Sequence, residues 1–478
     1  MVLASGCQSK NNPTVVIEPK PLAGKTLSIS ISDPALRNVL GPIARSWAVK
    51  TGAIVTESTG EDADIQLYRP MDFGVAASQK QILPLPKELR DSSHPYQILN
   101  VADSFVDGLA SWAGQPYGVM LSADESVLIY RKDRFDEPAN RTEYKTRFNR
   151  DLAPPASWEN AATIAEFFTK KDGKPCLAPL PKDTNKLLDL FDRVAACTDR
   201  PAITPTGTYG RKINEASFAA EVVSFEFEYP SCKPRLTAPG FTLALEILAA
   251  LQPSRATSGS DDPITCLNDG AIFAVVSMSE INRLPRDANG AVSARYGIAP
   301  LPGTLRYYDS LLKTVTVTNG SLPNFVPYFS GGWIGAVRAK CANPDAAFEL
   351  LAELGGPNGS AAVVSEPACG SGPWRSSLLD AGRKSLWLAY GFKPDQTDAL
   401  RNALKPYVAT DLRNPVIQSR GPGMEPLRKA LAEHVRAALT GKTTPIAAMA
   451  AAQADWVRLE AQAGPDVITW RKGDMRGK

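Results

Sequence analysis

This sequence has few histidines, no cysteines at metal-binding spacing and no long apolar runs. Its 478 residues include two histidines, His94 and His434, and neither lies near a cysteine cluster. No two cysteines stand in CxxC spacing, so no zinc site or other metal site is expected. Neither a Gly-x-Ser-x-Gly elbow nor an HExxH motif occurs, which argues against the common hydrolases. No run of eighteen apolar residues occurs either, so the body of the chain is not expected to span a membrane.

Excess charge of one sign is also absent. The formal net charge is +3, from 53 basic and 50 acidic residues, and no Lys/Arg-rich block is present. A nucleic-acid partner is therefore not expected. What the chain does have is 44% hydrophobic residues and a length sufficient for two lobes of ordinary size. These values are typical of a soluble globular protein.

One of the seven cysteines stands near the start, in the stretch Leu3-Ala-Ser-Gly-Cys7. Small residues before such a cysteine resemble the lipobox of bacterial lipoproteins, in which the thiol carries a lipid. Only six residues precede Cys7, fewer than a full signal peptide needs. An ordinary free cysteine is the alternative. We interpret residues 1–25 as lipobox and polar tether, which predicts a lipoprotein anchored in the cell envelope.

The other six cysteines form an even set, as expected of disulfides in an exported protein. Sequence neighbours suggest three pairs, although fifteen pairings are possible and buried free thiols are the alternative. The suggested pairs are Cys176–Cys197, Cys232–Cys266 and Cys341–Cys369.

Strand and helix patterns alternate from the start of the body. Apolar and polar residues alternate over residues 26–32, which predicts a strand. Asp33 followed by Pro34 is a typical cap and first turn of a helix. That helix is expected to break or kink at Pro42 and to end at Gly52.

Further strands are expected at residues 53–56 and 64–68, and the alternation predicts a parallel sheet with crossover helices. It continues to the end of the chain. Strands are expected at 127–130, 271–276 and 332–337, and helices after Ser157 and at 241–251, 345–354, 424–440 and 444–461.

Eight short motifs follow one another in a recognisable order over residues 26–461. They are Thr51-Gly52 before a Val/Ile strand, Gly114–Met120 with Ala123–Phe135, Pro155–Glu159, Lys233–Pro239, Asn268–Val275, Tyr296–Gly303, Ser330–Trp333 with Asn343–Phe348, and Ala437–Met449. This series resembles the extracellular solute-binding proteins of family 1, which include the maltose and glycerol-phosphate binders of ABC importers.

The resemblance implies an α/β, two-lobed periplasmic-binding-protein fold of type II, with the ligand in a cleft between the lobes. We assign residues 26–130 and about 286–340 to lobe 1, and residues 131–285 and about 341–478 to lobe 2. The implied function is capture of a sugar or oligosaccharide, followed by lobe closure and delivery to a membrane permease. No catalysis and no cofactor are expected, and the protein is expected to be a monomer.

Cleft residues are expected in the loops that follow the inner strands. Each has an alternative role as a solvated loop, turn, cap or core residue. The nominated ligand contacts are Tyr68, Arg69, Asp72, Ser122, Asp124, Glu125, Ser279, Glu280, Gly331, Gly332, Trp333, Trp374 and Arg375. Trp333 is the strongest nomination, because paired glycines precede it and an indole face can stack on a sugar ring.

Two other functions compete with solute import. An envelope enzyme acting on carbohydrates is one, because paired carboxylates cannot be recognised from sequence. A binding-protein scaffold reused as a sensor or interaction module is the other, and Arg69-Pro70 after the third strand is among the departures from the family pattern. Neighbouring permease genes would favour import.

Overall fold

The computed structural model describes residues 20–60, 62–203, 224–310, 312–318, 322–409 and 414–475. Cys7 and most of the predicted tether lie outside these residues. Residues 20–25, predicted to belong to the tether, instead form a turn against the end of the first helix, where Leu22 N donates to Thr51 O at 2.9 Å. No helix in the described ranges has the length and apolar character needed to cross a membrane.

Five strands form the first sheet, in the order β2-β1-β3-β13-β6. They are β1 (Thr26–Ser30), β2 (Ile54–Glu57), β3 (Ile65–Tyr68), β6 (Gly118–Ser122) and β13 (Trp333–Val337). β1 pairs in parallel with β2 and β3, as predicted, whereas β13 runs antiparallel to both β3 and β6. The sheet is therefore mixed.

Helix α1 (Pro34–Thr51) starts as its sequence predicts. The Asp33 carboxylate accepts from the backbone N–H groups of Ala35 and Leu36, and Gly52 ends the helix in the left-handed region. The predicted break at Pro42 is wrong, because the helix is continuous through that residue. Pro42 is exposed, so the carbonyl that loses its helical partner can bond to water.

The second sheet has three strands, and all of its pairs are antiparallel. β7 (Ser126–Arg131) lies between β8 (Phe273–Ser277) and β9 (Tyr296–Ala299). The alternation of strands and helices had predicted parallel pairing throughout. That prediction is wrong here, because the long helical insertion between β7 and β8 and the short connection from β8 to β9 follow paths that the local pattern does not encode.

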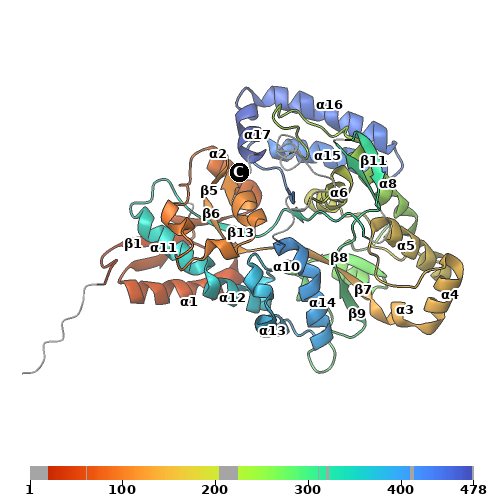
Figure 1. The fold of residues 1–478 in the computed structure, drawn as a ribbon, viewed down its shortest axis with the longest axis horizontal. Coiled ribbons are helices and arrows are strands. Elements are labelled where there is room, and N and C mark those ends of the chain that lie inside the picture. Colours follow the sequence, from red (N-terminus) through yellow and green to blue (C-terminus); the bar gives the residue numbers. More distant parts are fainter. Residues whose placement is uncertain are drawn as a thin grey trace, which may run out of the picture.

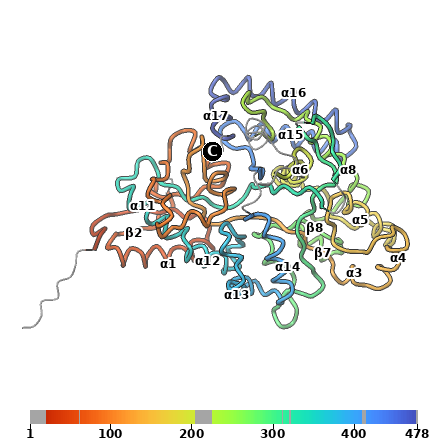
Figure 2. Tube along the Cα trace, in the orientation of Figure 1, coloured from red at the N-terminus to blue at the C-terminus, as the bar shows by residue number. Residues whose placement is uncertain are grey.

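Helices cover both sheets (Figures 1 and 2). On the first sheet lie α1, α2 (Pro70–Ser78), α11 (Pro344–Gly355) and α12 (Pro357–Ser365). A second apolar core joins the second sheet to α5 (Trp158–Asp172), α6 (Thr184–Asp199), α8 (Pro239–Ala250), α15 (Met424–Leu439) and α16 (Pro445–Ala463).

Shorter elements complete the described chain. The helices are α3 (Lys132–Asp136), α4 (Pro138–Phe148), α9 (Pro263–Asn268), α10 (Met278–Ile281), α13 (Lys384–Leu388), α14 (Pro394–Leu404) and α17 (Val467–Met475). The strands are β4 (Ser111–Trp112), β5 (Gln115–Pro116), β10 (Arg306–Asp309), β11 (Thr314–Val317), β12 (Tyr328–Phe329) and β14 (Val416–Ile417).

The lobe boundaries differ from the predicted ones. Residues 296–299 were assigned to lobe 1, but β9 pairs with β7 in the second sheet. Residues 344–365 were assigned to lobe 2, but α11 and α12 pack on β6 and α1 of the first sheet. β13 lies between β3 and β6, and the helices that follow it in sequence therefore pack on lobe 1.

The six cysteines of the body are free thiols, so the predicted disulfides are wrong for this structure. Proximity in sequence did not bring the sulfurs together. Cys176 Sγ donates to Ala165 O at 3.2 Å, whereas Cys197 Sγ accepts from Val326 N at 3.4 Å. Burial raises the pKa of Cys176 to about 11, which keeps the thiol protonated and poorly reactive. The remaining four free thiols are Cys232, Cys266, Cys341 and Cys369.

Candidate functional site

A cavity of about 770 Å³ opens between the two lobes. Side chains from the start of α2, from the segments that connect the sheets and from α6 and α15 contribute to its wall. The polar and charged lining residues are Arg69, Asp72, Asp124, Ser126, Thr184, Asn185, Lys186, Asp189, Arg193, Arg255, Asp261, Ser277, Ser279, Glu280, Ser330, Gln418, Glu425, Arg428 and Lys429. Such a wall can donate to and accept from many hydroxyl groups.

Lobe 1 contributes the residues that follow β3. Pro70 occupies the first turn of α2, so Arg69 and Asp72 are held at the start of that helix. The Arg69 guanidinium carbon lies 3.9 Å from the centroid of the Trp333 ring, a cation–π contact. Partial burial lowers the pKa of Arg69, although Asp124 and two other acids oppose the shift.

The connecting segments place an acid beside a serine. Asp124, just before β7, accepts from the backbone N–H of Ser279 at 3.0 Å and from its hydroxyl at 3.1 Å. Burial raises the pKa of Asp124, while the bonds from Ser279 and the charges of Arg193 and Arg69 oppose that rise. Gly331 packs against this acid so closely that a Cβ would lie 2.7 Å from the Asp124 Cβ. Glycine is needed there.

Lobe 2 presents one face of α6. Asp183 caps the helix by accepting from Lys186 N at 2.9 Å. Lys186, Asp189 and Arg193 follow at intervals of three to four residues, so they lie on the same side, toward the cavity. Lys186 also forms an ion pair of 2.9 Å with Glu280 of α10. α6 therefore contributes three charged side chains to this wall.

A buried charge cluster supports the lobe 2 wall. Arg428 Nη1 lies 3.2 Å from Asp192 and 3.9 Å from Glu226, and the Tyr328 hydroxyl donates to Asp192 at 2.8 Å. Both carboxyls are almost completely enclosed. Burial, followed by the charge of Glu226, raises the pKa of Asp192 to about 7. Two acids thus share one guanidinium, and one of them retains a proton near neutral pH.

Six of the thirteen nominated residues line the cavity: Arg69, Asp72, Asp124, Ser279, Glu280 and Gly331. Four others lie beside it with their polar groups or backbone engaged. Tyr68 OH donates to Gln66 Oε1, Ser122 Oγ accepts from Trp333 N, and a Cβ on Gly332 would clash with Ser122 O. Trp333 is half-buried against the lobe 1 core, with Arg69 over its ring.

Glu125 lies behind the wall rather than in it. Its side chain is 2% exposed, and neither carboxylate oxygen has a hydrogen-bond partner among the described residues. Burial raises the pKa of Glu125 well above the usual carboxyl range, which favours its neutral form. A hydroxyl acceptor in the cavity, the role nominated for it, would need to face the solute, and Glu125 does not line the cavity.

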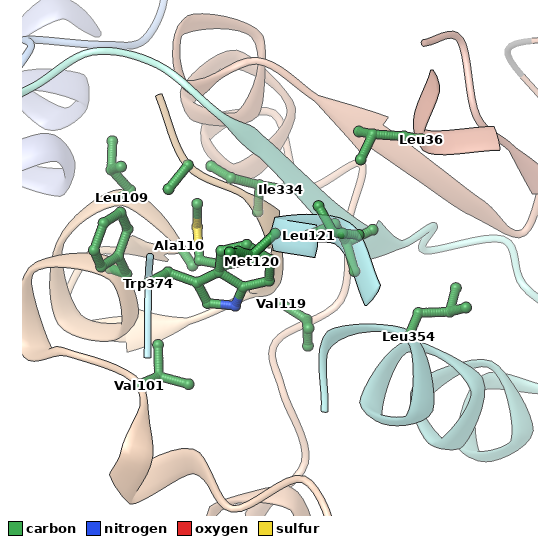
Figure 3. Close-up of a cluster of buried hydrophobic side chains, with 14 of the residues drawn as sticks. Leu36, Val101, Leu109, Ala110, Val119, Met120, Leu121, Ile334, Leu354 and Trp374 are labelled. Carbon is green, nitrogen blue, oxygen red and sulfur yellow. The ribbon is translucent and has the colours of Figure 1, made fainter. Parts of the chain in front are cut away.

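Trp374 and Arg375 are core residues of lobe 1, contrary to their nomination. Both side chains are completely buried, and Figure 3 shows Trp374 among Val101, Leu109 and Met120. Arg375 donates to the backbone carbonyls of Tyr96, Gln97 and Gly355 at 2.7–3.1 Å. Apolar side chains surround the Trp374 indole, and backbone carbonyl groups accept the hydrogen bonds of the Arg375 guanidinium. The pair therefore fits the interior of lobe 1.

The cavity residues that sequence reasoning missed come mainly from lobe 2. α6 was not among the predicted helices, and its polar face at positions 185, 186, 189 and 193 was the available signal. Arg255 follows a short turn after α8 and carries no motif. Gln418 follows β14, which pairs with β12, and Arg428 reaches the cavity from α15, which packs on α6.

No family model matches this sequence, and neither does any curated protein. Solved structures do match its fold. The sugar-binding protein MalE of Xanthomonas citri aligns with a TM-score of 0.64 at 14% identity, over 92% of this chain and 98% of that chain. A cyclic alpha-maltosyl-1,6-maltose binding protein of Arthrobacter globiformis aligns with a TM-score of 0.63 at 14% identity, over 94% and 99%.

A third neighbour is an ABC substrate-binding protein of Listeria monocytogenes in complex with cycloalternan, with a TM-score of 0.59 at 14% identity over 92% of this chain and 99% of that chain. These three neighbours are binding proteins rather than enzymes. At such low identity the likeness concerns the fold. The chain therefore has the two-lobed α/β fold of sugar-binding ABC substrate-binding proteins.

Proposed function

We propose that this protein is the solute-capture subunit of an ABC importer and binds a sugar or oligosaccharide between its lobes. The observation that carries the proposal is the interlobe cavity of about 770 Å³, whose lining comes from both lobes. A volume of this size suits a ligand of several sugar rings at most. A solute that touches both walls favours the closed arrangement, and a permease can recognise that arrangement.

The chemistry of the lining supports a hydroxylated solute. Carboxylates such as Asp72 and Asp124 can accept from sugar hydroxyls, and guanidiniums such as Arg69 can donate to two neighbouring oxygens. The fold neighbours are described as binding maltose-type sugars or cycloalternan, and another, from Agrobacterium radiobacter, is described in complex with ribitol. We assign ligand contact to Arg69, Asp72, Asp124, Ser279, Glu280 and Gly331.

The remaining parts of the proposal concern where the protein acts. A lipid on Cys7 would hold the chain at the outer face of the envelope membrane, beside its permease, because the small residues before this cysteine match a lipobox. The subunit would act as a monomer without a cofactor.

Binding and closure can be measured together. Purified protein is titrated calorimetrically with maltotriose, ribitol and a panel of neutral and acidic oligosaccharides, and small-angle scattering is recorded with and without each. We expect at least one saccharide to bind with a dissociation constant in the micromolar range or below, and to reduce the radius of gyration by about 1 Å.

A matched variant separates cavity binding from surface binding. Asp124→Asn keeps the shape of the side chain but loses a charged acceptor at the cavity, and it should weaken binding by about 1–3 kcal/mol. Glu349→Gln changes an exposed acid away from the cavity and serves as the control. Turnover of a saccharide without closure would favour an envelope enzyme, and binding of no saccharide would refute the proposal.

A further inference from the structure

Arg255 stands out among the cations of the cavity wall because nothing balances its charge. It follows the turn Gln252–Ser254 after α8, where a backbone bridge ties it to Leu177. Its Nη1 donates to Ala178 O at 3.0 Å. Nε is enclosed without an acceptor among the described residues, and Nη2 has no protein acceptor there either. Two of the three nitrogens of this guanidinium therefore have no acceptor among the described residues.

Most of the other cavity cations have an acid beside them, and Lys429, which has no ion pair among the described residues, is exposed to solvent. Lys186 is paired with Glu280, and Arg428 with Asp192. Arg193 forms no ion pair among the described residues, but the charges of Asp189 and Asp124 act on it. No charge of either sign acts appreciably on Arg255, and burial alone lowers its pKa to about 10.

Acids of the same region are already engaged. Asp261 accepts from Lys182 N at 2.6 Å, and Asp262 is paired with Arg283 at 2.8 Å. Arg255 is half-buried with Nε enclosed, and a guanidinium withdrawn from water in this way is stabilised when a counter-charge pairs with it. Neither of these two acids is paired with Arg255. The missing partner is therefore expected from outside the chain.

We propose that Arg255 binds an anionic group of the captured solute, so that the preferred ligand is an acidic saccharide. The planar guanidinium with free donors suits the two oxygens of a carboxylate or of a phosphate. This inference rests on the proposed function and specifies its substrate class. Neutral hydroxyls would satisfy the donors but leave the charge unbalanced, which is why a uronate or sugar phosphate is favoured.

Paired ligands that differ only in charge test the proposal. Wild-type protein is titrated with digalacturonate and its dimethyl ester, and with glucose 6-phosphate and glucose. We expect one acid to bind at least about tenfold more tightly than its neutral partner, as a charged hydrogen bond allows. The pair that shows the preference identifies a carboxylate or a phosphate as the anion.

Variants locate the effect. Arg255→Gln should reduce the preference to about twofold or less, whereas Arg255→Lys should retain part of it through its charge. Arg458→Gln removes an exposed arginine of α16 that does not line the cavity and should keep the full preference. Circular dichroism and melting of each variant establish that it is folded.

The outcomes distinguish this inference from the proposed function. Neutral saccharides that bind as tightly as acidic ones, or an acid preference unchanged in folded Arg255→Gln, would overturn the anion site and leave solute capture standing. If no saccharide of the panel, neutral or acidic, binds or closes the lobes, the proposed function fails and the anion site fails with it.

Discussion

Each lobe contains a buried arginine, but the two are satisfied differently. In lobe 1, Arg375 donates to backbone carbonyls of Tyr96, Gln97 and Gly355 and is paired with no carboxylate among the described residues. In lobe 2, Arg428 lies between the carboxyls of Asp192 and Glu226. The carbonyls of lobe 1 do not titrate, whereas the acids of lobe 2 do. The same residue type thus gives a pH-independent support on one side and a pH-sensitive one on the other.

Breaking the lobe 2 cluster should have the largest effect. Arg428→Ala leaves two enclosed carboxyls without their shared cation, and we expect the free energy of unfolding to fall by about 3–5 kcal/mol. Urea unfolding monitored by circular dichroism at pH 7 measures this. A loss below about 1 kcal/mol would show that the cluster is solvated rather than buried.

Removing the lobe 1 arginine should cost less. Arg375→Gln leaves buried carbonyl groups without donors, and we expect a loss of about 2 kcal/mol, comparable to the penalty for an unsatisfied buried acceptor. The loss should be the same at pH 5 and pH 8, because no titrating acid contacts this arginine. A clear dependence on pH would contradict the contrast between the lobes.

The pH dependence of stability tests the lobe 2 acids directly. Their folded-state pKa is raised, so between about pH 4 and pH 7 the folded protein holds a proton that the unfolded chain has released. Stability should therefore fall with rising pH in this window, on the order of 1 kcal/mol per pH unit, and level off above it. Asp192→Asn should remove much of this slope, as measured by urea unfolding at a series of pH values. An unchanged slope would show that other acids cause the pH dependence of stability.

Trp333, which lies beside the lobe 1 wall of the cavity, offers a smaller test. Because its ring lies under the Arg69 guanidinium, Trp333→Ala should weaken saccharide binding by about 1 kcal/mol through loss of the cation–π contact. Trp333→Phe, which keeps an aromatic face, should retain part of the binding affinity that Trp333→Ala loses. Calorimetric titration gives the affinities, and a variant that no longer folds would show that the indole serves the core instead.

The cysteines should have the smallest effect of all. With six free thiols in the body, reducing agent should leave the melting temperature unchanged within about 1 °C. Thiol titration of denatured, unreduced Cys7→Ser protein should find six reactive groups. A count of two or fewer would restore the disulfide prediction.

Local sequence was sufficient for the elements whose signals are local. The period-two pattern at residues 26–32 predicted β1, and Asp33-Pro34 predicted the start of α1. Ser157 was predicted to cap the helix that is α5, and its hydroxyl accepts from Asn160 N. The loops after β3 and before β7 predicted Arg69 and Asp124 at the cavity, because residues that leave an inner strand remain at its end.

The sequence by itself determined the α/β alternation and the resemblance to solute-binding proteins, since periodicity, caps and ordered motifs are properties of short segments. Only the tertiary structure decided that β13 inserts antiparallel beside β3, that the cysteines stay apart and that Trp374 and Arg375 are interior. It also decided that Arg255 faces the cavity without a counter-charge. The physical reason is that strand partners, burial and charge balance depend on residues distant in sequence, whose meeting no local pattern records.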